Sequence, residues 1–305
     1  MKVLITGGCG FLGTNLTGYL VTRGHEIKVL DNLSTAFPSW RSNLSAPDSR
    51  LPNVDLVKGD IRNRETVNDA VAGVNAVIHL AALTSVVESV EDPEETWEIN
   101  VQGTLNLLEA CRRHKAERFI FASSNAVAGE QTPPIDENKV PQPLSPYGAS
   151  KLAGEALCSA YWHSFGIKTV SLRFANLYGP FSEHKTSVIA LFLQWISGGK
   201  PLIIYGDGKQ TRDFIHAEDV CQAVHLSLTS GGPFGEVFQI ASGKETSVNK
   251  LVKALEEVTG KESEVIHQPE RMGEIRRNFS DITKARKMMG FEPEIELIEG
   301  LKRLS

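Results

Sequence analysis

Short apolar runs alternate with longer stretches of helical periodicity through the first half of the chain. The apolar runs are rich in β-branched residues, which is typical of buried strands. They cover residues 2–6, 27–30, 54–58, 76–79, 118–122 and 168–174. Helical stretches separate them, the clearest running from Glu94 to His114 and from Tyr147 to Phe165. This alternation predicts an α/β fold with a doubly wound parallel sheet that carries helices on both faces.

The pattern loosens in the second half of the chain. Short apolar runs at 201–205 and 237–240 mix with helical segments and with turns rich in glycine and proline. We expect a smaller C-terminal α/β lobe that covers the C-terminal edge of the sheet, where ligands bind in such folds. We therefore place one domain at 1–174 and the lobe at 175–305, with part of 213–240 returning to the main sheet.

A glycine-rich turn follows the first predicted strand and precedes a helix. Its glycines, Gly7, Gly10 and Gly13, are spaced one residue wider in the first gap than the common dinucleotide fingerprint. A helix N-terminus at such a turn holds a pyrophosphate, because its free N–H groups and its dipole favour an anion. The second strand ends in Asp31, where the acid that grips the adenosine ribose is expected. Asn32 follows it rather than an arginine, so we predict a Rossmann domain that prefers NAD to NADP.

Tyr147 and Lys151 lie four residues apart in a predicted helix, so they share one face of it. A phenol with its ordinary pKa near ~10 is too weak a base at neutral pH. A lysine cation, the positive end of a bound nicotinamide and a hydroxyl donor are expected together to lower that pKa towards neutrality. This change needs roughly 4 kcal/mol of differential stabilisation. This tyrosine–lysine spacing alone is common on solvent-exposed helices. It indicates a catalytic pair here because the same chain also contains the glycine turn.

Composition and charge exclude several classes of function. The 305 residues are 41% hydrophobic and 23% charged, as in ordinary globular proteins, and the net charge of −5 argues against nucleic acid as a partner. The first strand begins at residue 2 and no apolar run approaches ~20 residues, so we expect no signal peptide and no membrane segment. Four scattered cysteines indicate reduced, buried thiols of a cytoplasmic protein: Cys9, Cys111, Cys158 and Cys221. The eight histidines lack metal-ligand spacing, so we predict no metal.

Further motifs in a set order extend these features over nearly the whole chain. They are Gly7/Gly10/Gly13, Asp31-Asn32, Gly59-Asp60-Ile61-Arg62, His79-Leu80-Ala81-Ala82, Asn100, Ser123-Ser124, Tyr147/Lys151, Arg173-Phe-Ala-Asn176-Leu-Tyr-Gly-Pro180, Thr211-Arg212-Asp213-Phe-Ile-His216 and Asp281-Ile-Thr-Lys-Ala-Arg286. With them the chain resembles the extended short-chain dehydrogenases/reductases. Within these it resembles the NAD-dependent nucleotide-sugar epimerase/dehydratase group, and above all UDP-glucose (UDP-galactose) 4-epimerases.

The resemblance implies roles for individual residues. Ser124 binds the sugar 4-hydroxyl, Tyr147 removes its proton, and Lys151 holds the nicotinamide ribose and tunes Tyr147. The implied cofactor contacts are Gly7, Gly10, Phe11, Leu12, Gly13, Asp31, Asn32, Asp60, Ile61, Leu80, Ala81, Ala82, Asn100, Tyr147 and Lys151. The implied substrate contacts are Ser124, Tyr147, Asn176, Ser187, Val188, Tyr205, Arg212, Arg271, Glu274 and Asn278. Guanidinium groups grip pyrophosphate well, which agrees with the two arginines of the lobe.

The same resemblance implies the reaction and the assembly. A UDP-sugar, held by its diphosphate, is transiently oxidised at C4 by tightly bound NAD, turns as a 4-keto intermediate, and is reduced on its other face. The product is the C4 epimer. The resemblance also implies a homodimer whose helical face is formed by residues 94–114 and 147–165.

Alternatives remain on the same scaffold. A 4,6-dehydratase needs an Asp-Glu pair after its active-site hydroxyl residue, and Asn125 and Ala126 stand there instead. Lys185 can meet a carboxylate, so a UDP-glucuronate 4-epimerase or another UDP-sugar-modifying enzyme stays the alternative. A non-enzymatic alternative is a non-catalytic NAD-binding sensor protein. The presence of both Tyr147 and Lys151 disfavours this alternative.

Three positions depart from the family pattern or bear on substrate choice. Ala128 stands where the family usually has tyrosine, and we expect it to widen the pocket. Thr84 stands where UDP-galactose epimerases often have lysine, and we expect it to alter NAD retention. Asn278 aligns with a position that walls the sugar pocket, where a tyrosine crowds out a C2 N-acetyl group. We therefore expect a roomy pocket that also accepts sugars other than plain UDP-hexoses.

Overall fold

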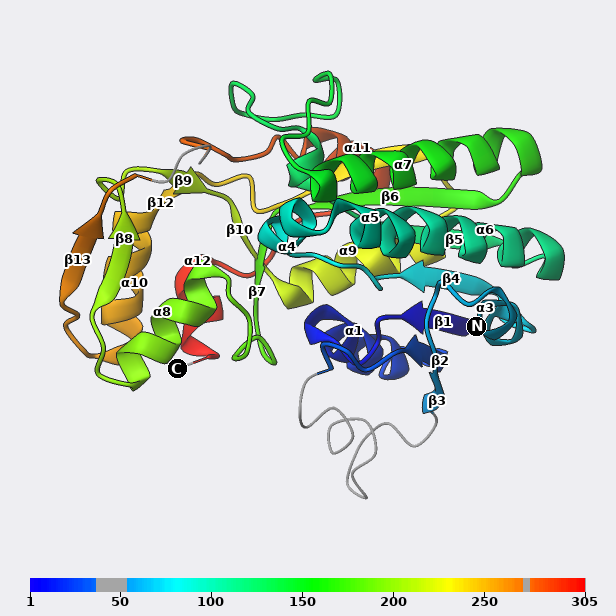
Figure 1. The fold of residues 1–305 in the computed structure, drawn as a ribbon, viewed down its shortest axis with the longest axis horizontal. Helices are drawn as coiled ribbons and strands as arrows, with labels where there is room; N and C mark the ends of the chain where they lie inside the picture. The colour runs from blue at the N-terminus through cyan, green and yellow to red at the C-terminus, as the bar shows by residue number, and fades with distance from the viewer. Residues whose placement is uncertain (37–53, 271–274, 305) are drawn as a thin grey trace.

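A seven-stranded parallel sheet forms the centre of the computed structural model (Figure 1). The structure describes residues 1–36, 54–270 and 275–304. The strand order is β11-β6-β5-β4-β1-β2-β3. The strands are β1 Lys2–Thr6, β2 Glu26–Asp31, β3 Val54–Lys58, β4 Ala76–His79, β5 Arg118–Ser124, β6 Lys168–Phe174 and β11 Glu236–Ile240. The predicted doubly wound α/β fold is confirmed.

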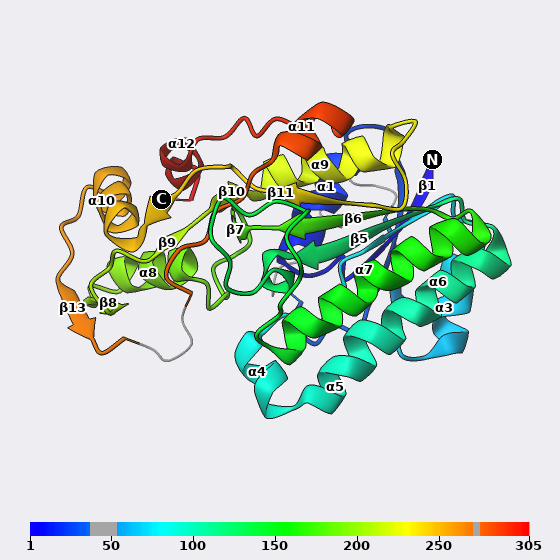
Figure 2. The same cartoon turned by 90° about the horizontal axis from the view of Figure 1, so that it is seen from above.

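Helices cover both faces of this sheet (Figures 1 and 2). Alternate residues of β1 point to opposite faces, so Val3 and Ile5 pack in the core with α1 and α9, while Leu4 packs in the core with α3, α6 and α7. The helices around the sheet are α1 Phe11–Val21, α3 Arg64–Val71, α4 Val86–Glu91, α5 Pro93–Trp97, α6 Gly103–His114, α7 Pro146–Phe165, α9 Ala217–Thr229 and α11 Thr283–Met289.

The strand order reverses beside β1. The chain runs outwards from β1 to β3 and then returns to the other side of β1 as β4. In such sheets the usual ligand site lies at the carboxyl ends of the strands where the order reverses, here those of β1 and β4. The glycine turn after Thr6 and the loop after His79 meet there.

The long predicted helix over 94–114 is interrupted. Between α5 and α6 the chain makes a π-helical turn, η1 Glu98–Gln102, in which Asn100 is buried. The other long helix, α7, starts as expected from its sequence: Ser145 caps it by accepting the Gly148 N–H at 3.1 Å, and Pro146 is its first residue. It ends at Gly166, whose φ of 72° favours glycine.

A smaller lobe lies beside the carboxyl ends of the strands, at the left of Figure 1. It has its own core, in which Phe192 and Leu202 pack against Leu251 and Leu255. The chain returns from it to the main sheet through α9 and β11, which pairs with β6. The boundary at 174/175 stays a prediction. The elements of this part are β7 Asn176–Tyr178, α8 Val188–Ser197, β8 Leu202–Tyr205, β9 Thr211–Arg212, β10 Phe214–His216, β12 Thr246–Ser247, α10 Val248–Thr259, β13 Val265–Gln268 and α12 Leu297–Lys302.

Within the described residues, no helix combines the length and apolarity needed to cross a bilayer. All four cysteines are buried and free of disulfides, as predicted.

Candidate active site

The glycine turn brings β1, α1 and the loop after β4 into very close contact. Gly7 has a φ of 72°, and a Cβ placed on it would lie 2.8 Å from the backbone nitrogen of Ala81. A Cβ on Gly13 would lie 2.2 Å from the Gly7 carbonyl oxygen. Helix α1 starts at Phe11 with Gly10 as its N-cap and no side chain bonded to its first N–H groups. The turn is therefore built to bring bare backbone donors to an anion.

Asp31 ends β2 beside this turn. Its Oδ2 accepts the Cys9 N–H at 2.9 Å and its Oδ1 accepts the Leu33 N–H at 2.7 Å. An ionised carboxylate has about four acceptor positions, so each oxygen retains one for a ribose hydroxyl. Burial, and next the charge of Asp31, raise the pKa of Cys9 to about 12, which keeps that thiol neutral.

Asp60 follows β3, the strand next to β2, at the same carboxyl-terminal edge of the sheet as Asp31. Arg62 binds its carboxylate through Nη2 at 2.8 Å and Nε at 3.1 Å, and Asn32 Nδ2 lies at 3.4 Å. The Arg62 side chain is the main cause of the lowered pKa of Asp60, so the acid is ionised. Ile61 is buried beneath Gly103 of α6. The predicted contact of Asp60 and Ile61 with adenine stays a prediction.

The loop after β4 is held by a buried histidine. His79 Nδ1 lies 2.8 Å from Thr6 Oγ1 and its Nε2 lies 3.0 Å from Thr104 Oγ1. Burial, and then the charge of Lys151, lower the pKa of His79 to about 3, so it is neutral at physiological pH. The Ala81 N–H also donates to Thr6 Oγ1, at 3.3 Å. His79 thus connects strands and is no acid or base for the reaction.

Asn100 connects this loop to the catalytic helix. Its Oδ1 accepts the Leu83 N–H at 2.8 Å, and its Nδ2 donates to the Leu83 carbonyl and to Ser150 Oγ, both at 2.9 Å. Ser150 in turn donates to the Tyr147 carbonyl at 2.8 Å. The π-helical turn places Asn100 in this position, as π turns often do at functional sites. Asn100 therefore acts through the backbone around the site.

The three predicted catalytic residues come together at the carboxyl end of β5. Ser124 is the last residue of that strand and hydrogen-bonds to the Tyr147 side chain. Lys151 is only 4% exposed and its Nζ donates to the Ala122 carbonyl at 2.8 Å. The same Nζ lies 5.9 Å from the centre of the Tyr147 ring. This constellation is the Ser–Tyr–Lys arrangement that the sequence predicted.

Burial dominates the electrostatics of Tyr147 and Lys151 in the chain without its cofactor. Burial raises the pKa of Tyr147 above its usual value, and the Ser124 hydrogen bond opposes this only in part. Burial also lowers the pKa of Lys151 to about 8. Desolvation dominates in the chain by itself, where the Lys151 ammonium is directed at the Ala122 carbonyl. The predicted lowering of the Tyr147 pKa also requires the nicotinamide of bound NAD, so it stays a prediction.

The predicted substrate residues lie in and beside the lobe. Asn176 starts β7 and its Nδ2 donates to the Asp213 carbonyl at 3.0 Å. Ser187 is the N-cap of α8 and Val188 is its first residue. Tyr205 ends β8. Arg271 and Glu274 lie outside the described residues.

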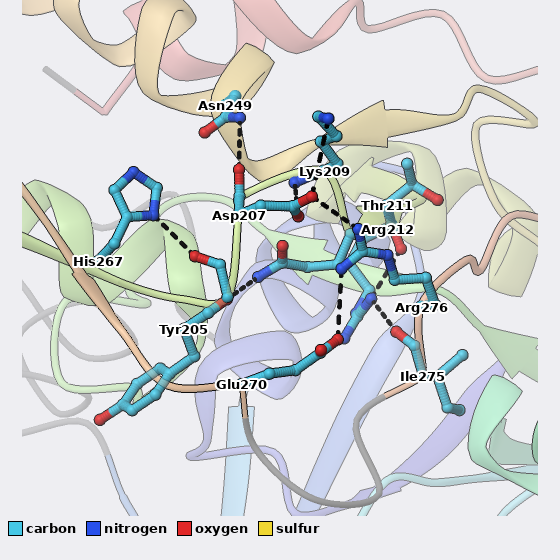
Figure 3. Close-up of polar contacts among 12 residues, drawn as sticks. Tyr205, Asp207, Lys209, Thr211, Arg212, Asn249, His267, Glu270, Ile275 and Arg276 are labelled. Carbon is cyan, nitrogen blue, oxygen red and sulfur yellow. Dashed lines mark hydrogen bonds and ion pairs between the residues drawn. The ribbon is translucent and has the colours of Figure 1, made fainter.

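Arg212 and its surroundings form a polar network in the lobe (Figure 3). Arg212 Nη1 donates to the carbonyls of Thr211 and Ile275, both at 2.8 Å. Arg276 beside it binds Asp207 at 2.8 Å and Glu270 at 3.3 Å. These contacts hold the chain on either side of residues 271–274 against β9. The contacts of Arg276 were not predicted from the sequence, because Asp207 is distant in sequence and neither partner forms a motif with it.

Asn278 extends from this network to the catalytic strand. It is 5% exposed, and its N–H donates to the Thr211 carbonyl at 3.2 Å. Its Oδ1 accepts a bond from Asn125 Nδ2 at 3.4 Å, while Asn125 Oδ1 lies 3.5 Å from Ser124 Oγ. The predicted pocket-wall residue is therefore two contacts from Ser124, a predicted catalytic residue.

Comparison with known proteins agrees with this geometry. Residues 3–241 match the model of the NAD dependent epimerase/dehydratase family. The chain belongs to this family. Its cofactor is therefore NAD, and the backbone donors of the glycine turn together with the free acceptor positions of Asp31 fit that cofactor.

Relatives within the family match the chain over nearly its full length. A protein of Methanocaldococcus jannaschii named putative UDP-glucose 4-epimerase is 38% identical over 99% of this chain and 96% of its own. UDP-glucuronate 4-epimerase of Thermodesulfobacterium geofontis is 34% identical over 98% of this chain and 94% of its own. The crystal structure of UDP-glucose 4-epimerase from Thermotoga maritima with UDP-glucose has a TM-score of 0.91 at 34% identity, and covers 99% of this chain and 97% of that one.

One buried group of this epimerase-family site was not singled out from the sequence. Glu155 lies one turn after Lys151 on α7 and forms an ion pair with Arg173 at 2.7 Å. The sequence feature that indicated it was the position of Glu155 four residues after Lys151, since residues four apart share one face of a helix.

Proposed function

We propose that this protein is a UDP-hexose 4-epimerase that works by transient oxidation at sugar C4. The observation that carries the proposal is the meeting of Ser124, Tyr147 and Lys151 next to the glycine turn and Asp31. Both parts are needed, because the hydroxyl chemistry requires the phenol and the redox step requires the cofactor. Relatives named UDP-glucose 4-epimerase support the choice of substrate.

The protein side of the reaction is proton transfer and positioning. Ser124 orients the sugar 4-hydroxyl towards the Tyr147 oxygen, which takes its proton and later returns it. The chemistry that NAD supplies when bound is reversible hydride acceptance at sugar C4. Lys151 is buried and Tyr147 partly buried, and a site poor in water strengthens the electrostatic interactions within it.

The lobe is proposed to hold the nucleotide while the sugar turns. Two backbone bonds hold the Arg212 guanidinium in the lobe, and a guanidinium is well suited to binding a diphosphate. Asn176, Tyr205 and the N-terminus of α8 at Ser187 and Val188 complete the proposed contacts. Arg271 and Glu274 are proposed as further ones from the family pattern alone.

One observation favours a second candidate, a UDP-glucuronate 4-epimerase. Lys185 lies half-buried after β7, where burial lowers its pKa and the charge of Glu88 opposes that shift. A sugar carboxylate would stabilise such a cation. The relative from Thermodesulfobacterium geofontis bears the name of this activity.

We also propose a homodimer formed by the faces of α5, α6 and α7. Trp97 is 52% exposed and Phe165 is 53% exposed on these helices, which is high for large apolar side chains. The cytoplasmic location stays a prediction.

The experiment that tests the proposed function is a substrate panel. The protein is incubated with UDP-glucose, UDP-galactose, UDP-N-acetylglucosamine and UDP-glucuronate, and the C4 epimers are resolved by NMR. We expect interconversion of UDP-glucose and UDP-galactose. Turnover of UDP-glucuronate alone selects the second candidate. Retained NAD with no epimer from any sugar would overturn both and favour the non-catalytic sensor.

A further inference from the structure

A buried ion pair lies directly beneath the active-site lysine. Glu155 is one helical turn from Lys151 on the same face of α7. Its carboxylate accepts hydrogen bonds from Arg173 Nε at 2.8 Å, Arg173 Nη2 at 2.7 Å and Ser123 Oγ at 2.5 Å. The Glu155 and Arg173 side chains are 5% and 4% exposed. The forked geometry is that of a strong, directional contact.

This ion pair joins the elements that carry the catalytic groups. Arg173 lies near the end of β6 and pairs in register with Ser123 of β5. Ser123 stands between Ala122, whose carbonyl accepts the bond from Lys151, and Ser124. Glu155 thus ties α7 to Ser123, the residue of β5 that stands between Ala122 and Ser124.

Stability by itself is a poor reason for such a pair. The free energy needed to desolvate two buried charges is often larger than the free energy gained from their attraction. Apolar side chains of similar size in the same place are therefore often at least as stabilising. A buried pair placed here therefore points to a task in the site.

The charges around Lys151 show what that task is. Burial lowers the pKa of Lys151, and Cys158 and Glu155 oppose this shift. The thiol of Cys158 has its pKa raised to about 12, chiefly by burial, and His79 has its pKa lowered to about 3, so both are neutral at working pH. Tyr147 is a protonated phenol there, because burial raises its pKa. Among these neighbours Glu155 supplies the negative charge, and Arg173 holds it in place.

We propose that Glu155 is a positioning residue that keeps Lys151 in its ammonium form and directed at the Ala122 carbonyl. The inference rests on the proposed function in that it needs a charged Lys151 beside the reacting sugar. Arg173 and Ser123 fix the carboxylate, so the negative charge stays on the lysine side of α7.

The test is the variant Glu155→Gln, which keeps the shape and removes the charge. Protein with its NAD, labelled with ¹³Cε-lysine, is titrated by NMR, and the Lys151 signal is assigned with Lys151→Arg. Burial lowers the pKa of Lys151 to about 8 in the chain without cofactor, and the midpoint of the wild-type NAD-bound protein is the reference for each variant. We expect the variant to titrate roughly one pH unit lower, a change of about tenfold in the acid constant. The alkaline limb of kcat should move by the same amount, with KM for the UDP-sugar within roughly twofold of wild type.

The matched control is Tyr161→Phe on the same helix. Tyr161 donates to Glu109 Oε1 at 2.7 Å, so the control also loses one bond to a carboxylate, on a group that the reaction does not use. It should lower Tm and leave the Lys151 midpoint unchanged. An unchanged midpoint in Glu155→Gln, or an equal shift in the control, overturns the proposal.

Two more variants keep the test decisive if Glu155→Gln does not fold. Glu155→Asp retains the charge, so the Lys151 midpoint should stay near wild type. We expect kcat to fall, because the shorter side chain loses the two-bond contact with Arg173. Glu155→Met combined with Arg173→Met leaves no unpaired charge, and Lys151 should titrate below wild type. A midpoint at or above wild type in that double variant contradicts the role of Glu155. If the midpoints shift as expected but no UDP-sugar is turned over, the proposed function fails and the electrostatic role of Glu155 stands.

Discussion

At the scale of the residue, Tyr147 is governed by two opposing effects. Burial favours the neutral phenol, and the hydrogen bond to Ser124 favours the phenolate. The first effect is larger, so the chain alone holds a protonated phenol at neutral pH. The base function that we propose for Tyr147 therefore depends on positive charge brought beside it, from Lys151 and from the nicotinamide ring of bound NAD.

Tyr147→Phe is expected to leave the fold and NAD binding intact and to remove turnover. The substitution deletes the ionisable oxygen and keeps the ring. Proton transfer by a positioned group typically contributes ~10²–10⁴-fold, so kcat on the preferred UDP-sugar should fall by that range. NAD content and Tm serve as controls. A variant that keeps more than half of the wild-type kcat would exclude Tyr147 as the proton acceptor.

Asp31 is expected to set the choice of cofactor. Its free acceptor positions suit the two ribose hydroxyls of NAD, and its charge repels the 2′-phosphate of NADP. Asp31→Ala combined with Asn32→Arg should weaken or reverse the preference. Calorimetry of cofactor-free protein with each dinucleotide measures it. Equal affinity of the wild-type protein for NAD and NADP would show that the assignment is wrong.

At the scale of the element, the sheet was predictable and the interruption of the long helix was not. The runs at 2–6, 54–58, 76–79 and 168–174 are strands with the predicted bounds. The run at 76–79 is buried at every residue, as expected for a central parallel strand, whereas the run at 54–58 is the partly exposed edge strand β3. The π-helical turn around Asn100 leaves no mark on the periodicity. Within it Asn100 contacts Leu83 and Ser150, which lie outside this helical stretch and are not apparent from its sequence.

His79 joins β1, β4 and α6, and should make the stability of the protein depend on pH. Its pKa is about 3 in the folded state, well below its unfolded value, so the unfolded chain binds more protons between these values. Stability is then fully present above pH 6.5 and falls as the pH drops. At pH 5 the loss from this residue is about 2 kcal/mol.

Urea unfolding at pH 7 and pH 5 measures this loss. His79→Asn should lose less stability than wild type between pH 7 and pH 5. At pH 7 the variant should be the less stable protein, because asparagine cannot keep both hydrogen bonds of His79 to Thr6 and Thr104. The same decrease in both proteins would assign the acid sensitivity to other groups.

At the scale of the whole molecule, the segment after residue 274 crosses from the lobe to the main sheet. Arg276 and Asn278 pair with Thr211 of β9, and Phe279 accepts the Ile135 N–H at 2.9 Å. Ile135 belongs to the loop that follows β5. Contacts between residues so far apart in sequence follow from the path of the chain, so the motifs placed Asn278 at the pocket wall but did not reveal its bond to Asn125.

This crossing makes Asn278 a test of how the lobe and the sheet together select the sugar. A tyrosine at 278 would extend well beyond the Asn125 amide that Asn278 now meets at 3.4 Å, towards Ser124 and the sugar. Asn278→Tyr should therefore depress kcat/KM for UDP-N-acetylhexosamines and spare UDP-glucose and UDP-galactose, because a steric block penalises the bulkier C2 substituent. Asn278→Ser is the matched control, since it loses the Asn125 contact without adding bulk and should affect both sugar classes alike. The ratio of the two kcat/KM values is the quantity to measure. If the tyrosine lowers both equally, or if the wild-type protein rejects every acetylated sugar, residue 278 does not gate the pocket.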